Sequence, residues 1–165
     1  MIEALVLRVL DVLLTPSSPV ASTIAAAVRL ASGAILIGFG QSKFAHHAKE
    51  ARAFDRYGLP APDVFTYAIG TVELVGGIML VLGLATRLVA FGLVGNMVGA
   101  IATGGRVDGG FVNLGLAPML LAAMSFLVWA GAGRFSLDEL IRRRLGLAQP
   151  VDRSSRNRHV RVSDT

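Results

Sequence analysis

One carboxylate, Glu73, stands near the middle of an apolar stretch, residues 63–84, that is long enough to cross a bilayer. An ionisable side chain at that depth costs about 3 kcal/mol to insert, so it needs an ion-pair partner, a proton or a water-filled cavity inside the protein. With such support the carboxylate can form a buried ion pair or help to bind a small polar ligand. The residues that meet Glu73 therefore determine what this part of the chain can do.

Three further polar residues fall near the same depth in other apolar stretches: Arg29, Asn96 and Ser125. At about 1.5 Å of rise per residue, Arg29 and Glu73 differ in depth by about one helical turn, which an arginine side chain can span. We therefore predict a buried ion pair between Arg29 and Glu73, with Asn96 beside it and Ser125 close by. Each of the four apolar stretches then contributes one side chain to a single polar layer.

Lys43 is the second candidate partner of Glu73, because it shares a helical face with Arg29. It lies near the far end of the first apolar stretch, about 15 Å from Glu73 along the helix axis by the same rise per residue. A contact between Lys43 and Glu73 would therefore need an irregular or re-entrant connection after Gly40.

The polar layer has two interpretations, and the sequence leaves both open. A buried and satisfied polar cluster can fix the register of a helical bundle without binding anything. Alternatively, the layer lines a small cavity that binds the head group of a quinone or another small ligand. A metal site is not expected, because the adjacent His46 and His47 point about 100° apart on a helix and cannot both bind one ion.

Four apolar stretches must position these side chains, at residues 22–40, 63–84, 87–103 and 113–132. Hydrophobic residues make up 53% of the chain and charged residues 16%, a balance typical of an integral membrane protein. We predict an all-α fold, a transmembrane four-helix bundle over residues 22–133. Because the chain has no cysteine, thiol–disulfide chemistry and iron–sulfur clusters are excluded, and any redox role needs a partner or a diffusible cofactor.

The segments outside the bundle are predicted to be interfacial or disordered. Residues 1–21 are expected to form an interfacial helix and a linker, and residues 134–147 an amphipathic helix that lies on the membrane surface. A capping box of Ser136 and Glu139 opens the second helix. The connection 41–61 is expected to hold a short surface helix, and residues 148–165 form a basic tail that we predict to be disordered.

Basic residues give the chain a net charge of +5, and much of the excess lies near the C-terminus. In a membrane protein this pattern favours contact with anionic lipid, and we expect no nucleic-acid partner. An even number of spans places both termini on one side. The basic residues Arg87, Arg134 and 142–144 indicate the cytoplasmic side of the plasma (inner) membrane, although the basic residues of the connection 41–61 would then lie outside.

A set of short motifs in a fixed order resembles the DoxX family of small four-helix membrane proteins. The motifs are Arg29-Leu-Ala-Ser-Gly33 with Gly40 and Lys43, Tyr57-Gly-Leu-Pro60, Glu73-Leu-Val-Gly-Gly77, Leu82-Gly-Leu-Ala-Thr-Arg87 and Gly131-Ala-Gly-Arg-Phe-Ser-Leu-Asp138. The resemblance covers about residues 25–140 and implies a four-helix bundle. It also implies roles found among relatives, as membrane subunits of quinone-linked sulfur oxidation or as membrane partners of soluble enzymes that handle oxidative stress.

We therefore expect an accessory or anchoring subunit of a membrane redox complex, with a quinone as the candidate cofactor and an oxidoreductase as the candidate partner. We expect no catalytic activity from the chain on its own. One alternative is a carrier for a small solute or lipid, which would need a homo-oligomer because four spans are few for alternating access. Another alternative is a membrane scaffold that binds no small ligand.

Overall fold

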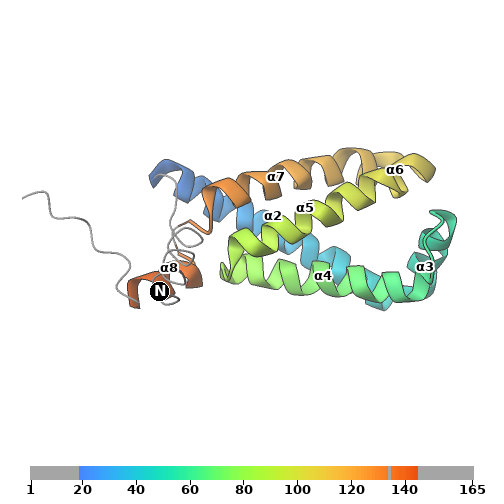
Figure 1. The fold of residues 1–165 in the computed structure, drawn as a ribbon, viewed down its shortest axis with the longest axis horizontal. Coiled ribbons are helices and arrows are strands. Elements are labelled where there is room, and N and C mark those ends of the chain that lie inside the picture. The colour runs from blue at the N-terminus through green and yellow to red at the C-terminus, as the bar shows by residue number, and fades with distance from the viewer. Residues whose placement is uncertain (1–18, 134, 145–165) are drawn as a thin grey trace, which may run out of the picture.

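A computed structural model of the chain describes residues 19–133 and 135–144. Within these ranges every regular element is helical, and four helices are long and apolar enough to cross a membrane. The predicted all-α membrane bundle is confirmed. In chain order the elements are α2 (Pro19–Ala45), α3 (His47–Arg56), α4 (Pro62–Leu82), α5 (Thr86–Ala102), α6 (Gly104–Val107), the π-helical turn η1 (Val112–Leu116), α7 (Ala117–Ala130) and α8 (Leu137–Arg144) (Figure 1).

The first helix, α2, is longer at both ends than the predicted span 22–40. It begins at Pro19, inside the predicted linker, and continues through Gly40 to Ala45 without a break. Gly40 serves packing rather than termination, because a Cβ at this position would lie 2.6 Å from the backbone nitrogen of Leu74 on α4. The rest of the predicted interfacial segment, residues 1–18, and the tail 145–165 lie outside the described residues.

Glycine contacts set the register between the antiparallel helices α2 and α4. A Cβ on Gly33 would lie 2.9 Å from the carbonyl oxygen of Gly77, and a Cβ on Gly77 would lie 2.8 Å from the carbonyl oxygen of Gly33. Closer to the C-terminal end of α2, the Cβ of Lys43 lies 3.1 Å from the position of a Cβ added to Gly70. The end of α2 is therefore level with the middle of α4, and α4 extends past it to pack against α3.

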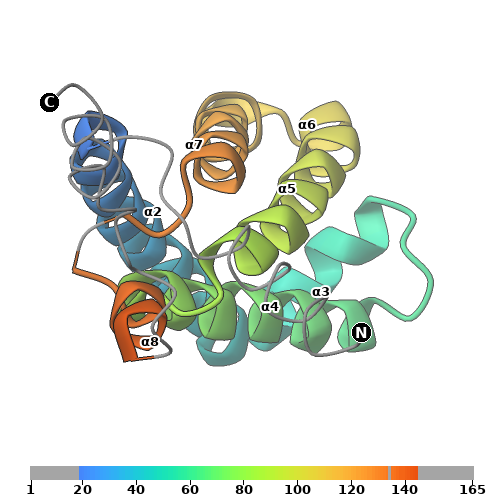
Figure 2. The same cartoon turned by 60° about the vertical axis from the view of Figure 1, so that its left-hand side comes forward.

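The helices form two pairs, α2 with α4 and α5 with α7 (Figure 1). Larger side chains hold the second pair, with a buried core of Leu93, Met97, Leu120, Met124 and Leu127. The pairs approach each other at the end that carries α8 and separate toward the end that carries α3. Figure 2 shows α3 lying across that second end, where it contacts α4 and reaches α6.

The last described helix, α8, docks on the turn between α4 and α5. The buried carboxylate of Asp138 accepts hydrogen bonds from the backbone nitrogens of Ala85 at 2.8 Å and Thr86 at 3.0 Å. It therefore caps the N-terminus of α5 from a distant part of the chain, where a negative charge is favoured.

The capping box predicted at the start of α8 is half present. Ser136 Oγ accepts the backbone N–H of Glu139 at 3.1 Å, as predicted. The carboxylate of Glu139 does not return to Ser136, because it binds the guanidinium groups of Arg142 and Arg143 instead.

Candidate functional site

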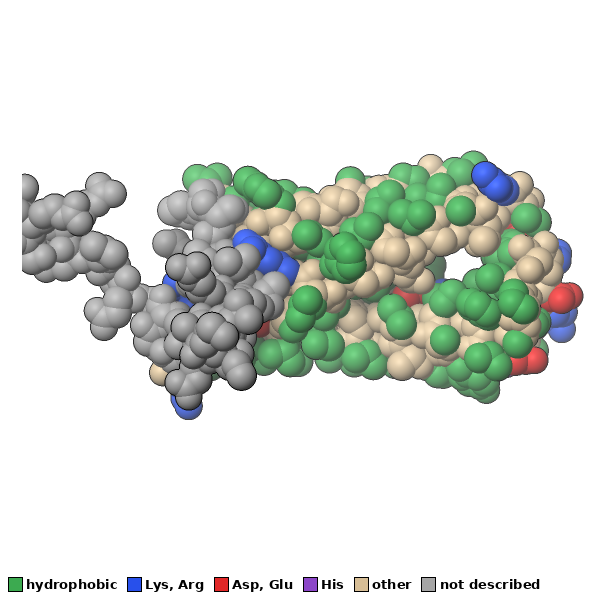
Figure 3. Space-filling model, viewed as in Figure 1, with side chains coloured by type: hydrophobic (Ala, Val, Ile, Leu, Met, Phe, Trp, Pro, Cys, Tyr) green, Lys and Arg blue, Asp and Glu red, His purple; other side chains and the backbone are tan. Residues whose placement is uncertain are grey.

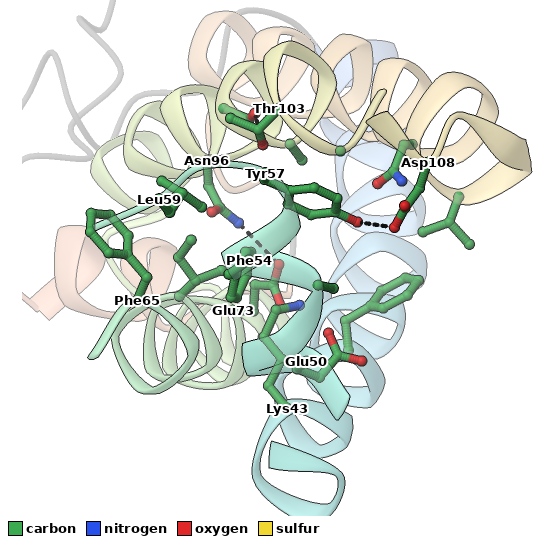
Figure 4. Close-up of a pocket in the computed structure, with 18 of the residues that line it drawn as sticks. Lys43, Glu50, Phe54, Tyr57, Leu59, Phe65, Glu73, Asn96, Thr103 and Asp108 are labelled. Carbon is green, nitrogen blue, oxygen red and sulfur yellow. Dashed lines mark hydrogen bonds and ion pairs between the residues drawn. The ribbon is translucent and has the colours of Figure 1, made fainter. Parts of the chain in front are cut away.

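Glu73 has two polar partners, and they come from two other helices. Lys43 Nζ at the end of α2 lies 2.7 Å from Glu73 Oε2, and Asn96 Nδ2 on α5 donates to Glu73 Oε1 at 3.2 Å. Glu73 is 6% exposed and Lys43 is 9% exposed, so the ion pair is largely removed from solvent. Both carboxylate oxygens are thus engaged, and Figure 4 shows the three side chains pointing toward one another.

The predicted contact between Arg29 and Glu73 is wrong. The side chain of Arg29 is 1% exposed and lies at the α8 end of the bundle, where its Nη2 donates to the carbonyl oxygen of Phe135 at 3.0 Å. Rise per residue gives equal depths only when the spans end at the same level, whereas the glycine contacts shift α4 relative to α2. This shift brings Lys43, the second candidate, to Glu73 without any irregular connection, since α2 stays regular through Gly40.

Ser125 also lies away from the polar cluster. It is exposed on α7, and its Oγ donates to the carbonyl oxygen of Leu121 in its own helix at 2.8 Å. The structure therefore brings together three of the five predicted site residues, namely Lys43, Glu73 and Asn96.

The Lys43–Glu73–Asn96 cluster lines a cavity of about 580 Å³ between the two helix pairs at the α3 end. Figure 3 shows an opening through the molecule beside this end, with charged side chains at its edge. The volume is within the range of small-molecule sites, which are mostly apolar with a few placed polar groups. The part of the lining around the cluster fits this description, because the cluster is accompanied by Phe39, Phe54, Phe65, Ile69 and the bare backbone of Gly95 and Gly99.

A second polar group closes the α3 end of the cavity. Asp108, just after α6, lies 3.0 Å from Arg56 Nη2 and accepts the hydroxyl of Tyr57 at 2.6 Å (Figure 4). Burial, together with the bond to Asp108, raises the pKa of Tyr57 to about 12. The hydrogen bonds from Tyr57 and Arg56 hold the pKa of Asp108 below its usual value. These contacts fasten α3 to α6, and we call α3 with this group the strap.

The sequence predicts the helix of the strap, because α3 is the short helix expected in the connection 41–61, but it does not predict how that helix is fastened. The glycine-rich segment 103–110 has the composition of a flexible turn, but Gly104–Val107 is helical and Asp108 bonds Arg56. The sequence holds one signal for this contact, because Tyr57 is the first residue of a motif that carries the family resemblance. Among the described residues no three His, Cys, Asp or Glu side chains gather closely enough to hold a metal ion.

Fold and site together define a small four-helix membrane protein with a cavity between two helix pairs, and buried polar side chains line one side of this cavity. The DoxX family model matches residues 24–106, and the chain belongs to the DoxX family. The Mycobacterium tuberculosis protein named "Uncharacterized membrane protein Rv3486" is 36% identical over 131 residues, which are 71% of this chain and 80% of that protein. The Bacillus subtilis protein named "Putative oxidoreductase CatD" is 36% identical over 76 residues, which are 46% of this chain and 55% of that protein. No solved structure matches the chain.

Proposed function

We propose that this protein is a ligand-binding membrane subunit of a redox assembly and that its cavity holds the head of a quinone-type molecule. The observation that carries the proposal is the buried Lys43–Glu73–Asn96 cluster on the floor of a cavity of about 580 Å³. The name of the relative CatD supports a redox setting. Because the chain has no cysteine, an oxidoreductase partner would have to exchange electrons with the bound molecule.

The donor set of the cavity fits a quinone head. A quinone ring presents carbonyl oxygens, which need hydrogen-bond donors, and the Lys43 ammonium group carries three N–H donors, of which Glu73 engages one. The Asn96 amide has one further N–H besides the one that it donates to Glu73, and Phe39 and Phe54 offer apolar surface to a flat ring. A bound quinone would supply two-electron chemistry, while the ion pair with Glu73 holds the Lys43 side chain at the wall of the cavity.

Equilibrium binding tests the proposal. We would titrate the purified protein in nanodiscs with a benzoquinone that carries a decyl chain. We expect saturable binding by the wild type and about tenfold weaker binding by Asn96→Leu and Lys43→Met, or about 1.4 kcal/mol each. Ser125→Ala is the matched control, since Ser125 bonds only within its own helix among the described contacts. Absence of saturable binding by the folded wild type would refute the proposal, and equal binding by all four proteins would place the ligand elsewhere.

We further propose that both termini lie in the cytoplasm and that the strap faces the outer side of the plasma (inner) membrane. The arginines of α8, which end at Arg144, support this orientation. Because the chain lacks cysteine, single cysteines report sidedness cleanly. In intact cells we expect a membrane-impermeant maleimide to label Ala48→Cys on α3 and to spare Arg144→Cys. The reverse pattern would invert the topology.

A further inference from the structure

The cavity opens sideways between α4 and α5. Gly95 and Gly99 line the cavity and are also exposed on the surface of α5, so they form its edge. Phe65 and Ile69 of α4 line the opposite edge and are partly exposed. We call the gap between these four residues the side doorway. It exists because α4 and α5 are joined by a tight turn at Gly83 and separate from there toward the strap.

The side doorway lies at the depth of the lipid tails. The candidate span Thr86–Val107 contains both glycines, which stand nine and thirteen residues after Thr86. At 1.5 Å per residue these positions are about 14 and 20 Å along the helix, inside a hydrocarbon core of about 30 Å. A molecule that passes this doorway therefore comes from the bilayer and not from water.

The doorway is apolar and has room for a chain. A Cβ added to Gly95 or Gly99 would meet no atom within 4 Å, and the opposite edge consists of one aromatic and one aliphatic side chain. None of the four residues carries a charge. The polar cluster lies deeper, where Asn96, the neighbour of Gly95, reaches Glu73. An apolar chain in the doorway thus leads directly to a polar head at the cluster.

The aqueous end offers a less direct route. The strap crosses it, fastened by Arg56 and Tyr57 to Asp108 at 3.0 and 2.6 Å. Charged residues of α3, namely Lys49, Glu50 and Arg52, line the cavity at this end. These charged side chains are well hydrated at the aqueous end. An apolar chain that entered there would have to leave the lipid and be exposed to water, which is unfavourable.

We propose that the occupant is a lipid-phase molecule with a polar head and an apolar chain, which enters sideways and leaves its chain in the side doorway. The proposal rests on the proposed function for the head group and adds the route and the class of molecule. The strap stays fastened while the molecule enters.

Leucine substitutions at the glycines test the doorway. Gly95→Leu and Gly99→Leu place a side chain in the gap, and the matched control is Gly92→Leu, one turn earlier on α5. Gly92 is also exposed and also has no atom within 4 Å of an added Cβ, but it does not line the cavity. The probes are the decyl-substituted benzoquinone and the same ring without its chain. We expect Gly95→Leu to weaken binding of the chain-bearing probe at least tenfold relative to the chainless probe, and Gly92→Leu to change neither.

A cross-link across the strap tests the route independently. The chain has no cysteine, so Arg56→Cys with Asp108→Cys can be joined specifically by a short bis-maleimide. We expect the linked protein to take up the chain-bearing probe as fast as the unlinked one. Loss of uptake on linking, or equal binding of both probes by Gly95→Leu and the wild type, would overturn the side doorway.

Native mass spectrometry separates failure of this inference from failure of the proposed function. If neither quinone probe binds but a phospholipid remains on the wild type and on Gly92→Leu and is lost from Gly95→Leu, then the doorway stands and the quinone function falls. If quinone binds and the doorway variants behave as the wild type, then the function stands and the doorway falls. If no lipid-phase molecule is retained by any folded protein, both are refuted.

Discussion

In the described part of the chain, two clusters of buried charge lie toward opposite ends of the bundle, and they differ in what surrounds them. At the α8 end, Arg29 and Asp138 are 1% and 2% exposed, and both bond backbone groups. Arg29 donates to the carbonyl oxygen of Phe135, and Asp138 accepts from the backbone nitrogens of Ala85 and Thr86. At the α3 end, Glu73 bonds only side chains in the described contacts, and its cluster faces a cavity. Charges of the first kind hold segments of the chain together, whereas charges of the second kind keep groups available to a ligand.

We call the cluster of Arg29 and Asp138 the sealed cluster, and its end of the bundle the sealed end. The residues packed against it have less room for a larger side chain than those around the cavity. Gly83 has φ +68°, and a Cβ there would lie 1.5 Å from Arg29 Nη1 and 2.5 Å from the Cβ of Ser136, so any other residue would be strained and would displace its neighbours. Around the cavity, by contrast, Gly95 and Gly99 have open space beside them. Tight packing at one end and free volume at the other is the arrangement expected of a scaffold that supports a binding site.

The largest expected effect is at the sealed end. Asp138→Ala removes the cap of α5 and also the favourable electrostatic interaction of the Asp138 carboxylate with the buried Arg29, so we expect a loss of about 3–5 kcal/mol of stability. Thermal unfolding in detergent measures it, with Asp55→Ala on the exposed side of α3 as the control. A loss no greater than that of the control would mean that the sealed cluster does not hold α8 and the α4–α5 turn together.

A smaller effect is expected at the cavity. Lys43→Met leaves Glu73 without its cation, but water in the cavity can solvate the carboxylate, so we expect a loss of about 2 kcal/mol. A double-mutant cycle with Glu73→Leu should show coupling, because the two side chains touch. The same cycle between Arg29→Leu and Glu73→Leu should be additive. Coupling in the second cycle and none in the first would reverse the assignment of the partners.

An effect of about 1 kcal/mol per charge is expected at the surface of α8. Leu140 and Ile141 are exposed beside Arg143 and Arg144, and we expect this side of α8 to lie on anionic lipid. Replacing the two arginines with glutamine should weaken the association of α8 with vesicles that contain phosphatidylserine, measured by fluorescence of a probe at Leu140→Cys. Lys49→Gln at the opposite end is the control. An unchanged signal would mean that α8 is held only by Asp138.

The smallest effect is expected at the strap, whose bonds to Asp108 should not change with pH within the ordinary range. The pKa of Tyr57 is raised above its usual value, so its bond to Asp108 is complete below about pH 10 and is lost as the pH rises through about 12. The pKa of Asp108 is lowered, so its contribution is complete above about pH 4 and is lost as the pH falls through the lowered value. A spin label on Ala53→Cys should keep constant mobility from about pH 5 to pH 9. A transition inside that window, absent from Asp108→Asn, would show that the strap opens at physiological pH.

The sequence predicts the spans well because about twenty apolar residues are a strong signal on their own. It also predicts that Asn96 meets Glu73, since both lie near the middle of their helices. It fails for Arg29, because depth measured from span ends ignores the register that Gly33 and Gly77 impose between α2 and α4.

Contacts between segments that are distant in the sequence cannot be predicted from local sequence patterns. Asp138 caps α5 across 52 residues, and Tyr57 meets Asp108 across 51 residues. A capping motif reveals only its local bond, as the bond between Ser136 and Glu139 illustrates. Such pairings depend on the tertiary arrangement, which helical periodicity does not contain.

The tight turn at Gly83 also determines how the molecule can deform. The glycine contacts between α2 and α4 resist sliding of these helices, so we expect the easiest motion to be a rotation of one helix pair against the other about this turn. The arm formed by α5 is about 25 Å long, so a rotation of about 2° moves its far end by about 1 Å. We therefore expect a small displacement at the α8 end to become larger at the cavity, and we expect the bonds of Arg56 and Tyr57 to Asp108 to limit how far the two helix pairs separate.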